Sequence, residues 1–324
     1  MNQLKNKKDS HLATFLLKVL SFLIILFILD FSIGSLLKSL YSKQKSGLLY
    51  RGTYSLDSTK ADILIFGASR ANHHYIPKIF EKRMHLSCYN TGRDGEIIFY
   101  NYAVLKTVLN RYSPKVAILD FSRQEFLVDQ NDYDRLSALF PYYKSHKDIR
   151  PIVELKSPYE KYKLMSKIYP YNSLLFTILI GTTNFNESRD YIEDENGYVP
   201  LPDVSNRKLY VDTVCKSYLL DSNKIDIFKE FVNDCVQSKV KLYIILSPVF
   251  IEYTCPDASV KIAKEYAKKF NIPVISYLND SLFFHNYLFA DEAHLNDSGA
   301  QIFTNQVIDS ITTNHSNYGN HMKK

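Results

Sequence analysis

The sequence predicts an α/β fold: a three-layer α/β/α sandwich with a parallel sheet, preceded by one N-terminal transmembrane helix. Two observations lead to this prediction. Short apolar runs alternate with amphipathic stretches beyond residue 60, and an unbroken apolar run occupies residues 12–37. Strands joined by right-handed helical crossovers are parallel, so the alternation favours a sheet with helices on both faces. The stretch from 61 to 312 has a length that suits a single domain.

Five segments are predicted as strands: residues 62–66, 86–90, 115–120, 241–246 and 273–277. All but the second are aliphatic and nearly non-alternating, which is typical of strands buried on both faces. Helices are predicted at residues 96–111, 222–238, 257–270 and 298–310. In the first of these, Ile97, Val104 and Val108 recur at helical spacing and provide an apolar face for packing on the sheet.

The run at residues 12–37 is long enough to cross the roughly 30 Å hydrocarbon core of a membrane as one helix. Its charged residues, Lys18 and Asp30, lie toward opposite ends, where a long side chain can reach the headgroups. A cleaved signal peptide would have a shorter apolar stretch and a site of small residues after it, and none is evident. We therefore expect an uncleaved anchor.

The basic residues on the two sides of this run do not settle its orientation by count. They are Lys5, Lys7 and Lys8 before the run, and Lys38, Lys43, Lys45 and Arg51 after it. Because the short N-terminal tail of a signal anchor is usually cytoplasmic, we predict a single-pass protein of the cytoplasmic membrane with its C-terminal domain outside. In this division residues 1–11 are a cytoplasmic tail, 38–60 a polar linker, 61–312 the domain and 313–324 a flexible tail.

A candidate nucleophile follows the first predicted strand, where Gly67 and Ala68 lead into Ser69. A serine hydroxyl needs an imidazole to accept its proton and a carboxylate to orient that imidazole. Asp291 and His294, with two residues between them, stand just before the last predicted helix and can fold so that the carboxylate meets one ring nitrogen. The other ring nitrogen would face Ser69. The sequence thus predicts a Ser69, His294 and Asp291 triad, in an order unlike that of chymotrypsin or subtilisin and without the G-x-S-x-G elbow.

These motifs and their order resemble the SGNH, or GDSL-like, hydrolase superfamily, especially its membrane-anchored branch involved in acylating cell-surface polymers. The resemblance extends over residues 60–125 and 240–312. It implies that Ser69 is the nucleophile, and that the N–H groups of Ser69 and Gly92 form an oxyanion hole. It also implies an esterase or acyltransferase that uses no cofactor.

The chain departs from the family pattern in two places. Ala68 stands where the family has an Asp, and no Asn follows the third strand, where the family has a further oxyanion donor. Ser122, Arg123 and Gln124 are the side chains at that point, and each has a hydrogen-bond donor. Ser122 is the first choice because it is nearest the strand end and loses little entropy on ordering. Backbone N–H groups alone are the alternative.

Other residues give weaker indications of a functional site. Arg70 and Arg123 are weak candidates for binding an anionic substrate, whereas His73 and His74 are interpreted as flanking the helix that follows Ser69. Gly67 has none of the further glycines of a dinucleotide site, and the histidines lack the spacing of metal ligands. We therefore predict no cofactor and no metal.

An insertion at residues 126–220 interrupts the alternation and is rich in tyrosine. The tyrosines are Tyr133, Tyr142, Tyr143, Tyr159, Tyr162, Tyr169, Tyr171, Tyr191, Tyr198 and Tyr210. They can form a satellite core, the slightly favoured interpretation, or a cap that binds sugar rings through aromatic faces and hydroxyls. The apolar run 174–180 is too short for a second membrane span.

Composition limits the partners. A net charge of +6 on 324 residues, with no dense basic stripe, argues against nucleic acid as a partner. Cys88, Cys215, Cys235 and Cys255 show no C-x-x-C pairing, and the sequence does not say which of them form disulfides.

Together these features predict a membrane-anchored serine esterase or O-acyltransferase, with acetyl the expected acyl group, acting on an extracytoplasmic glycan or envelope polymer. Its expected partners are that polymer, the membrane and a membrane-bound acyltransferase. The alternative is an inactive SGNH-fold protein that binds a glycan or helps to assemble an acylation or export complex.

Overall fold

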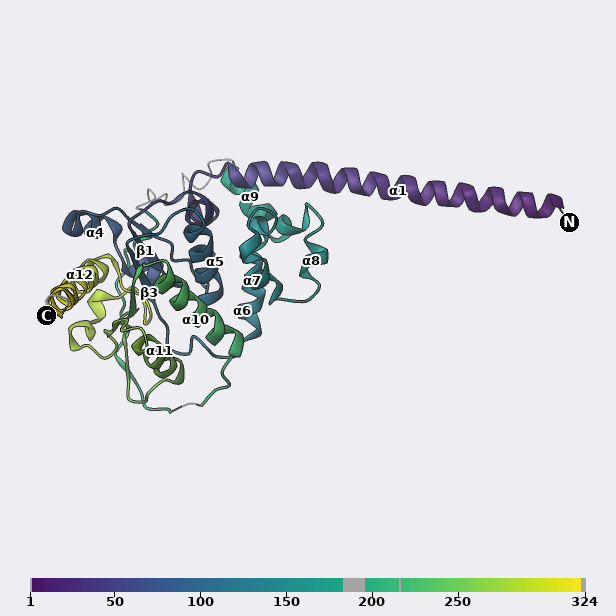
Figure 1. Cartoon of the computed structure of the whole chain (residues 1–324). Helices are drawn as coiled ribbons and strands as arrows, with labels where there is room; N and C mark the ends of the chain where they lie inside the picture. The colour runs from purple at the N-terminus through teal and green to yellow at the C-terminus, as the bar shows by residue number, and fades with distance from the viewer. Residues whose placement is uncertain (1, 183–195, 216, 322–324) are drawn as a thin grey trace.

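The computed structural model describes residues 2–182, 196–215 and 217–321. It is a mixed α/β structure in which one long helix, α1 (Asn2–Ser42), extends away from a compact domain (Figure 1). The part His11–Ser42 is long and apolar enough to cross a membrane, and its apolar window is not buried against the domain. The predicted span at 12–37 therefore belongs to a longer continuous helix.

The centre of the domain is a five-stranded sheet in the order β2-β1-β3-β5-β7, in which every neighbouring pair is parallel. Its strands are β1 (Ile63–Phe66), β2 (Cys88–Asn90), β3 (Val116–Asp120), β5 (Lys241–Leu246) and β7 (Val274–Ser276). Each lies within its predicted range, so the parallel sheet expected from the sequence is confirmed. The strand order reverses between β1 and β3, and open α/β sheets bind ligands outside the carboxyl ends of the strands at such a point.

Alternate residues of the strands belong to two separate hydrophobic cores. Leu64 and Phe66 of β1 share one core with three helices: α5 (Ile98–Leu109), α10 (Ser222–Gln237) and α11 (Ala258–Lys268). Ile63 and Ile65 share the other core with three more: α3 (Ser69–His74), α4 (Pro77–Met84) and α12 (Asp297–His321). Both sides of each strand are therefore buried, which explains why the strands read as continuous apolar runs.

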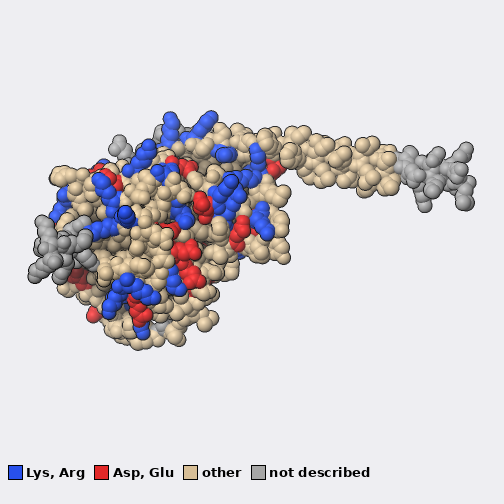
Figure 2. All heavy atoms as spheres, viewed as in Figure 1, with Lys and Arg blue, Asp and Glu red and all other residues tan. Residues whose placement is uncertain are grey.

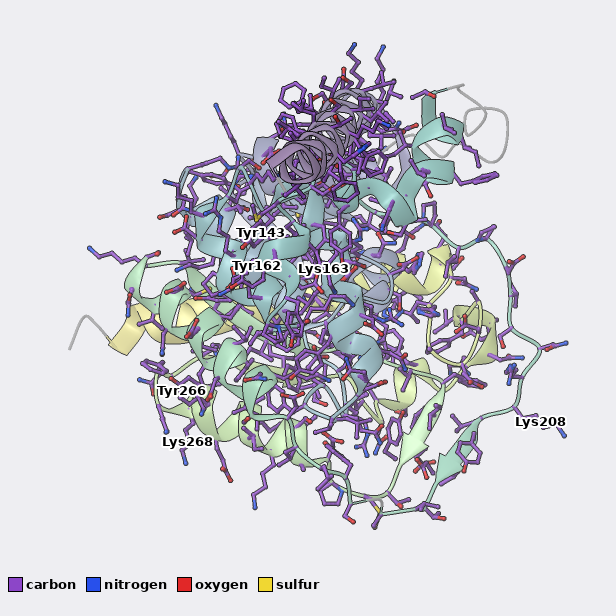
Figure 3. The ribbon with its side chains drawn as sticks, turned by 90° about the vertical axis from the view of Figure 1, so that its right-hand side faces the viewer. Tyr143, Tyr162, Lys163, Lys208, Tyr266 and Lys268 are labelled. Atoms are coloured by element: carbon purple, nitrogen blue, oxygen red, sulfur yellow. A yellow bond between two sulfur atoms is a disulfide. The ribbon has the colours of Figure 1, made fainter. Side chains whose placement is uncertain are left out.

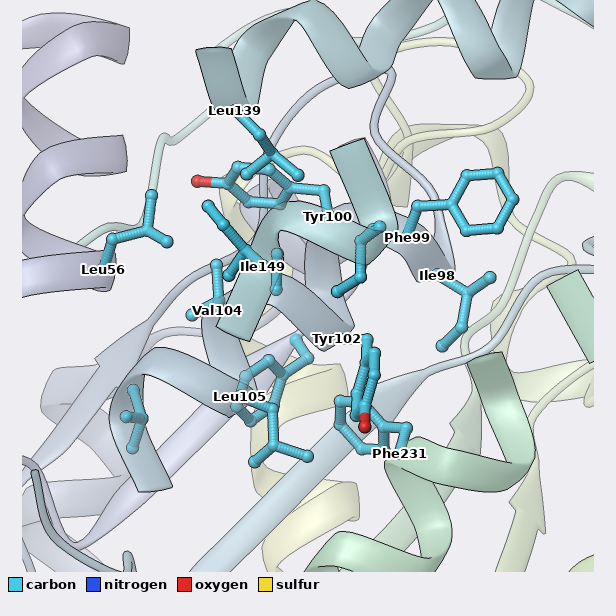
Figure 4. Packing of buried hydrophobic residues seen from close by; sticks show 14 of the residues in the cluster. Leu56, Ile98, Phe99, Tyr100, Tyr102, Val104, Leu105, Leu139, Ile149 and Phe231 are labelled. Carbon is cyan, nitrogen blue, oxygen red and sulfur yellow. The ribbon is translucent and has the colours of Figure 1, made fainter. Parts of the chain in front are cut away.

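The segment expected to be a polar linker, residues 38–60, is instead helical and packed on the domain. After α1 ends at Ser42, α2 (Gly47–Thr53) and a π-helical turn (Tyr54–Ser58) follow directly. Leu49 and Leu56 are buried, and Figure 4 shows Leu56 beside the side chains of α5. Polar residues outnumber the few apolar residues that pack on the domain, so the composition of this segment resembles that of a linker.

The insertion begins with short helical pieces that lie between α5 and the base of α1 (Figure 1). They are α6 (Gln130–Arg135), η2 (Leu136–Tyr142), η3 (Lys147–Ile149), α7 (Arg150–Glu154), α8 (Glu160–Lys163), η4 (Tyr169–Leu174) and α9 (Leu175–Thr182). The chain returns along the domain and forms a small parallel sheet from β4 (Tyr210–Asp212) and β6 (Ile251–Tyr253). A disulfide joins Cys215 to Cys255 next to this sheet.

Several of the insertion's tyrosines pack in the main core and do not form a separate one. Tyr142, Tyr143 and Tyr171 are buried in the same cluster as α5, and the Tyr142 hydroxyl lies 2.8 Å from that of Tyr41 on α1. Figure 3 shows Tyr143 and Tyr162 below the end of α1. The buried rings pack between α1 and the domain, so they are not available to a sugar. Tyr191 lies outside the described residues.

The expected flexible tail at 313–324 is helical as far as His321, the last residue that the structure describes. Helix α12 continues to His321, beyond the predicted end at 310. Phe303, Val307 and Ile311 are fully buried at four-residue spacing, and no proline follows them to stop the helix.

Candidate active site

The turn after β1 requires glycine and presents Ser69 at the start of α3. Gly67 has φ of +150°, and a Cβ there would lie 2.7 Å from the Ala71 side chain and 2.9 Å from the Asp120 side chain. Its N–H donates to Asn101 Oδ1 at 3.0 Å, which ties the turn to α5. Ser69 is the first residue of α3, so its backbone N–H has no acceptor within the helix.

The loop before α12 is folded around one carboxylate. Asp291 Oδ1 accepts the N–H groups of Ala293 at 2.7 Å and His294 at 2.9 Å. The same carboxylate contacts His294 Nδ1, at 2.9 Å through Oδ2 and 3.0 Å through Oδ1. A spacing of three residues is what lets an Asp side chain close such a turn and still reach the ring.

The structure brings the three predicted residues together. His294 Nε2 lies 2.7 Å from Ser69 Oγ, although 225 residues separate them in the chain. Hydrogen bonds therefore connect the Asp291 carboxylate, the His294 imidazole and the Ser69 hydroxyl in series. This is the geometry in which an imidazole can accept the proton of a serine hydroxyl.

The protonation state of Asp291 suits that arrangement. Burial raises the pKa of Asp291, but hydrogen bonds from His294 and Ala293 outweigh it and leave the pKa below its usual value. The carboxylate is therefore ionised at neutral pH and stabilises the His294 tautomer that carries its proton on Nδ1. His294 Nε2 is then free to accept from Ser69.

Two further histidines line the site, where the sequence indicated only helix-flanking residues. The His73 and His74 rings stand edge-on to the His294 ring, with centroids 5.5 Å and 6.3 Å away. His73 Nδ1 donates to the Val199 carbonyl at 2.6 Å. His74 Nε2 accepts the N–H of Leu295 at 2.9 Å, which fixes the residue next to His294. Their positions four and five residues after Ser69, on the same short helix, are the sequence signal for this role.

We expect His74 to make the fold sensitive to mild acid. Burial, followed by the charges of Arg70, His294 and His73, lowers the pKa of His74 well below its usual value. The unfolded chain takes up this proton near pH 6.5 while the folded chain does not. The free energy of unfolding should therefore fall below about pH 6.5, by up to about 1.4 kcal/mol per pH unit from this residue.

Urea unfolding of the detergent-solubilised chain between pH 5 and 7 measures this slope. His74→Gln, whose amide oxygen can still accept from Leu295, should flatten it, whereas His285→Gln at an exposed position should not. An unchanged slope in His74→Gln would contradict the expectation.

Gly92 does not fit its expected part in an oxyanion hole. Its N–H already donates to Asn90 Oδ1 at 2.9 Å. Asn90 is itself fixed, because its amide donates to the carbonyls of Ala71 at 2.6 Å and Tyr75 at 3.0 Å. A Cβ at Gly92 would lie 2.6 Å from the Asn72 nitrogen, so this glycine is needed for close packing against α3. In this structure Gly92 has a packing role, and its N–H is hydrogen-bonded to Asn90.

The residues after β3 divide into two groups. Ser122 Oγ accepts a hydrogen bond from Arg70 Nη2 at 2.5 Å, so Ser122 belongs to the surroundings of Ser69 through the neighbouring arginine. Arg123 turns toward the disulfide-bonded loop, where it lies 3.9 Å from the ring centroid of Tyr253 and donates to the Cys255 carbonyl at 3.1 Å. The N–H of Gln124 likewise faces the Asp257 carboxylate, at 3.2 Å.

The two arginines named from the sequence line one polar pocket of about 290 Å³. Arg70 is on the side of Ser69, and Arg123 is on the side of the small sheet and the Cys215–Cys255 disulfide. Asp212 and Asp257 also line this pocket, so its charge is mixed. Such a lining offers hydrogen-bond donors and acceptors together.

Comparison of the chain with protein-family models and with curated proteins finds no match in either.

Asp120, the last residue of β3, was not among the residues expected at the site, but its carboxylate lies beside Arg70 and Tyr75. Its Oδ2 accepts the Tyr75 hydroxyl at 2.6 Å, and its Oδ1 lies 3.7 Å from Arg70 Nε. Burial raises the pKa of Asp120, and Arg70 and Tyr75 oppose that rise. The carboxylate holds Arg70 beside Ser122 and the nucleophile turn. An acidic residue at the end of an otherwise apolar strand, in line with Ser69, is the signal that could have found it.

Proposed function

We propose that this chain is a membrane-anchored SGNH-like serine esterase or O-acyltransferase that acts on an acylated, extracytoplasmic glycan or envelope polymer, with acetyl as the acyl group. The observation that carries the proposal is the series of hydrogen bonds from Asp291 through His294 to Ser69. The two cores on opposite faces of the sheet support the finer assignment of a three-layer α/β/α sandwich. The strand order supports it too, since it puts the residues after β1 and β3 at the reversal point.

The proposed reaction has two halves. Ser69 Oγ attacks the ester carbonyl carbon while its proton passes to His294 Nε2, and the ionised Asp291 stabilises the imidazolium that forms. The carbon–oxygen bond to the sugar then breaks, and His294 returns the proton to the departing oxygen. Water or an acceptor hydroxyl next gives its proton to His294 and attacks the acyl-serine, which frees Ser69. The identity of that acceptor separates hydrolysis from transfer.

The negative charge of the tetrahedral intermediate needs hydrogen-bond donors. The N–H groups of Ser69 and Gly92 were the expected pair, but the N–H of Gly92 already donates to Asn90. The N–H of Ser69 supplies one donor. For the second we propose the Ser122 hydroxyl: it accepts from Arg70 through a lone pair, so its own hydrogen is available to the substrate. Arg70 would place positive charge behind that hydroxyl, which strengthens it as a donor.

Labelling with a serine-reactive phosphonate tests the proposal, because only an activated serine is trapped. We also keep a second candidate function, a glycan-binding or assembly protein that retains the fold without catalysis. The occupied N–H of Gly92 and the absent Asn favour it. Such a protein would remain unlabelled.

We propose that α1 spans the cytoplasmic membrane once, with the domain on the outer side. The length and apolarity of the helix support the span. The Cys215–Cys255 disulfide supports the sidedness, because disulfides persist in exported proteins and are rare in the cytosol.

Protease added to intact spheroplasts should digest the domain beyond residue 60 and leave a membrane-embedded fragment that contains α1. A cytoplasmic protein of the same cells serves as the control for integrity and should survive. If the domain were digested only after lysis, it would face the cytoplasm, and an envelope substrate would have to be abandoned.

A further inference from the structure

A pocket of about 240 Å³ lies where α1 meets the insertion, away from the Ser69 site. Lysines from three segments line it: Lys38 from α1, Lys144 after η2, and Lys167 before η4. Ser35 and Ser145 add hydroxyl groups to the same lining. Figure 2 shows the described stem of α1 with few charges until it reaches the domain, where blue side chains gather.

The three ammonium groups outnumber the acid beside them: Lys144 Nζ donates to the carbonyls of Met165 at 2.9 Å and Ser166 at 3.2 Å, and Lys167 Nζ lies 3.4 Å from the ring centroid of Phe31. Among the residues that the structure describes, none of the three forms an ion pair with Asp or Glu. Burial lowers the pKa of Lys144; Asp30 opposes this effect, and Lys167 and Lys38 add to it. Asp30 is the acid that acts on Lys144; its oxygens also accept from Ser166 Oγ and from the N–H of Lys167 at 2.8 Å, and its single negative charge balances one of the three lysines. A net positive charge therefore remains at the pocket.

The height of the pocket along α1 matches the headgroup layer of a bilayer. An apolar run of 26 residues, from 12 to 37, is about 39 Å long as a helix, which exceeds a hydrocarbon core of about 30 Å. Gly34 and Ser35 lie in the last turn of that run and Lys38 lies just past it, so the pocket is at the edge of the hydrocarbon core.

A second apolar element lies at the same place. Helix α9 runs beside the end of α1 (Figure 1), and Gln44 Nε2 donates to the Ile178 carbonyl at 3.2 Å. Yet Phe176 is 80% exposed and Leu179 54% exposed. An apolar helix face next to basic residues and a membrane span is typical of an element that rests in the membrane interface.

We propose that this pocket binds the phosphate of an anionic phospholipid headgroup in the leaflet that faces the domain, with α9 resting in the interface beside it. Lys38, Lys144 and Lys167 provide the charge, and the apolar faces of α1 and α9 contact the acyl chains. The inference rests on the proposed membrane anchoring but not on the serine chemistry. Its consequence is a fixed orientation of the Ser69 site relative to the membrane surface.

Native mass spectrometry of the full chain, released from micelles containing equal phosphatidylglycerol and phosphatidylcholine, tests the site. We expect the chain to retain at least about five times as much phosphatidylglycerol as phosphatidylcholine. Each lysine near a headgroup favours binding of an anionic lipid by about that factor. Lys38→Gln/Lys144→Gln/Lys167→Gln should bring the ratio close to one. The matched control Lys208→Gln/Lys264→Gln/Lys268→Gln removes as much charge from positions away from α1; Figure 3 labels two of them.

The charge-conserving variant Lys144→Arg/Lys167→Arg should keep the preference, which attributes the loss in the glutamine variant to charge. If the triple variant fails to fold, Lys38→Gln alone, at an exposed position, should lower the ratio. Equal retention of both lipids by the parent chain, or a preference unchanged in the glutamine variant, would overturn the site. Competition by millimolar inorganic phosphate as effective as lipid would identify a free-anion site instead. Ser69→Ala should retain the full lipid preference. Failure of the esterase proposal can therefore be distinguished from failure of the lipid site. Recovery of the chain in the soluble fraction without detergent would overturn the anchor and this site together.

Discussion

Replacement of Ser69 by Ala should lower the turnover of a small acetyl ester by at least about a thousandfold, because removing the nucleophile of a triad costs as much as removing the whole triad. The hydroxyl has one hydrogen-bond partner within the triad, His294 Nε2, so its loss should leave the fold nearly unchanged. Purified full-length chain and an aryl acetate whose release is followed by absorbance provide the measurement.

Ser222→Ala is the matched control, because this serine is exposed at the start of α10. It should behave like the parent chain. Labelling by a serine-reactive phosphonate should be found on the Ser69 peptide and disappear in Ser69→Ala. Turnover that persists in Ser69→Ala, or a label on another serine, would contradict the assignment. No turnover and no label in the parent chain would favour the non-catalytic alternative.

The sheet and the triad could be predicted from the sequence because their signals are local. A parallel strand buried on both faces has to be a short aliphatic run, and β3 and β5 show no alternation at all. Ser69 follows such a run directly. Asp291 and His294 share a turn whose closure depends on their three-residue spacing, and that spacing is visible in the sequence.

The hydrogen bond at the Gly92 N–H was not expected, because it depends on a contact that the pattern does not encode. A Gly after the second strand suggests a free N–H, but Asn90, two residues earlier, folds its side chain back onto that N–H. The same Asn binds the carbonyls at the end of α3, so its position is set by tertiary packing. In the sequence Asn90 is simply the last residue of a predicted strand, and nothing near it indicates that its side chain would contact the Gly92 N–H.

The anchor junction was missed for a different physical reason. Residues 38–60 and the first half of the insertion pack as short 3₁₀, π and α turns, which are too brief for a helical period to emerge. Tyrosine adds to the ambiguity because its ring is apolar while its hydroxyl is polar. Tyr41 and Tyr142 satisfy each other's hydroxyl in the core, whereas Tyr159 and Tyr162 are exposed. Composition alone does not distinguish these two fates.

Replacement of Asp120 by Ala should lower the free energy of unfolding by about 3–5 kcal/mol, because it leaves one partner of a buried ion pair uncompensated. The Asp120 side chain is 1% exposed and that of Arg70 is 15% exposed, so water cannot fully replace the lost contact. The Tyr75 hydroxyl, which donates to Asp120 in the fully buried core, would also lose its acceptor. Urea unfolding of the full chain in detergent, followed by circular dichroism, measures the change.

The variant Asp120→Asn separates charge from hydrogen bonding. Its amide oxygen can still accept from Tyr75 and face Arg70, so we expect it to lose less than half as much stability as Asp120→Ala. Both variants should reduce ester turnover, because Arg70 would no longer be held against Ser122, and Asp120→Asn should do so while folded. A loss below about 1 kcal/mol in Asp120→Ala, within the range of an exposed ion pair, would show that Arg70 finds another partner. The proposed support of Ser122 as an oxyanion donor would then lose its structural basis.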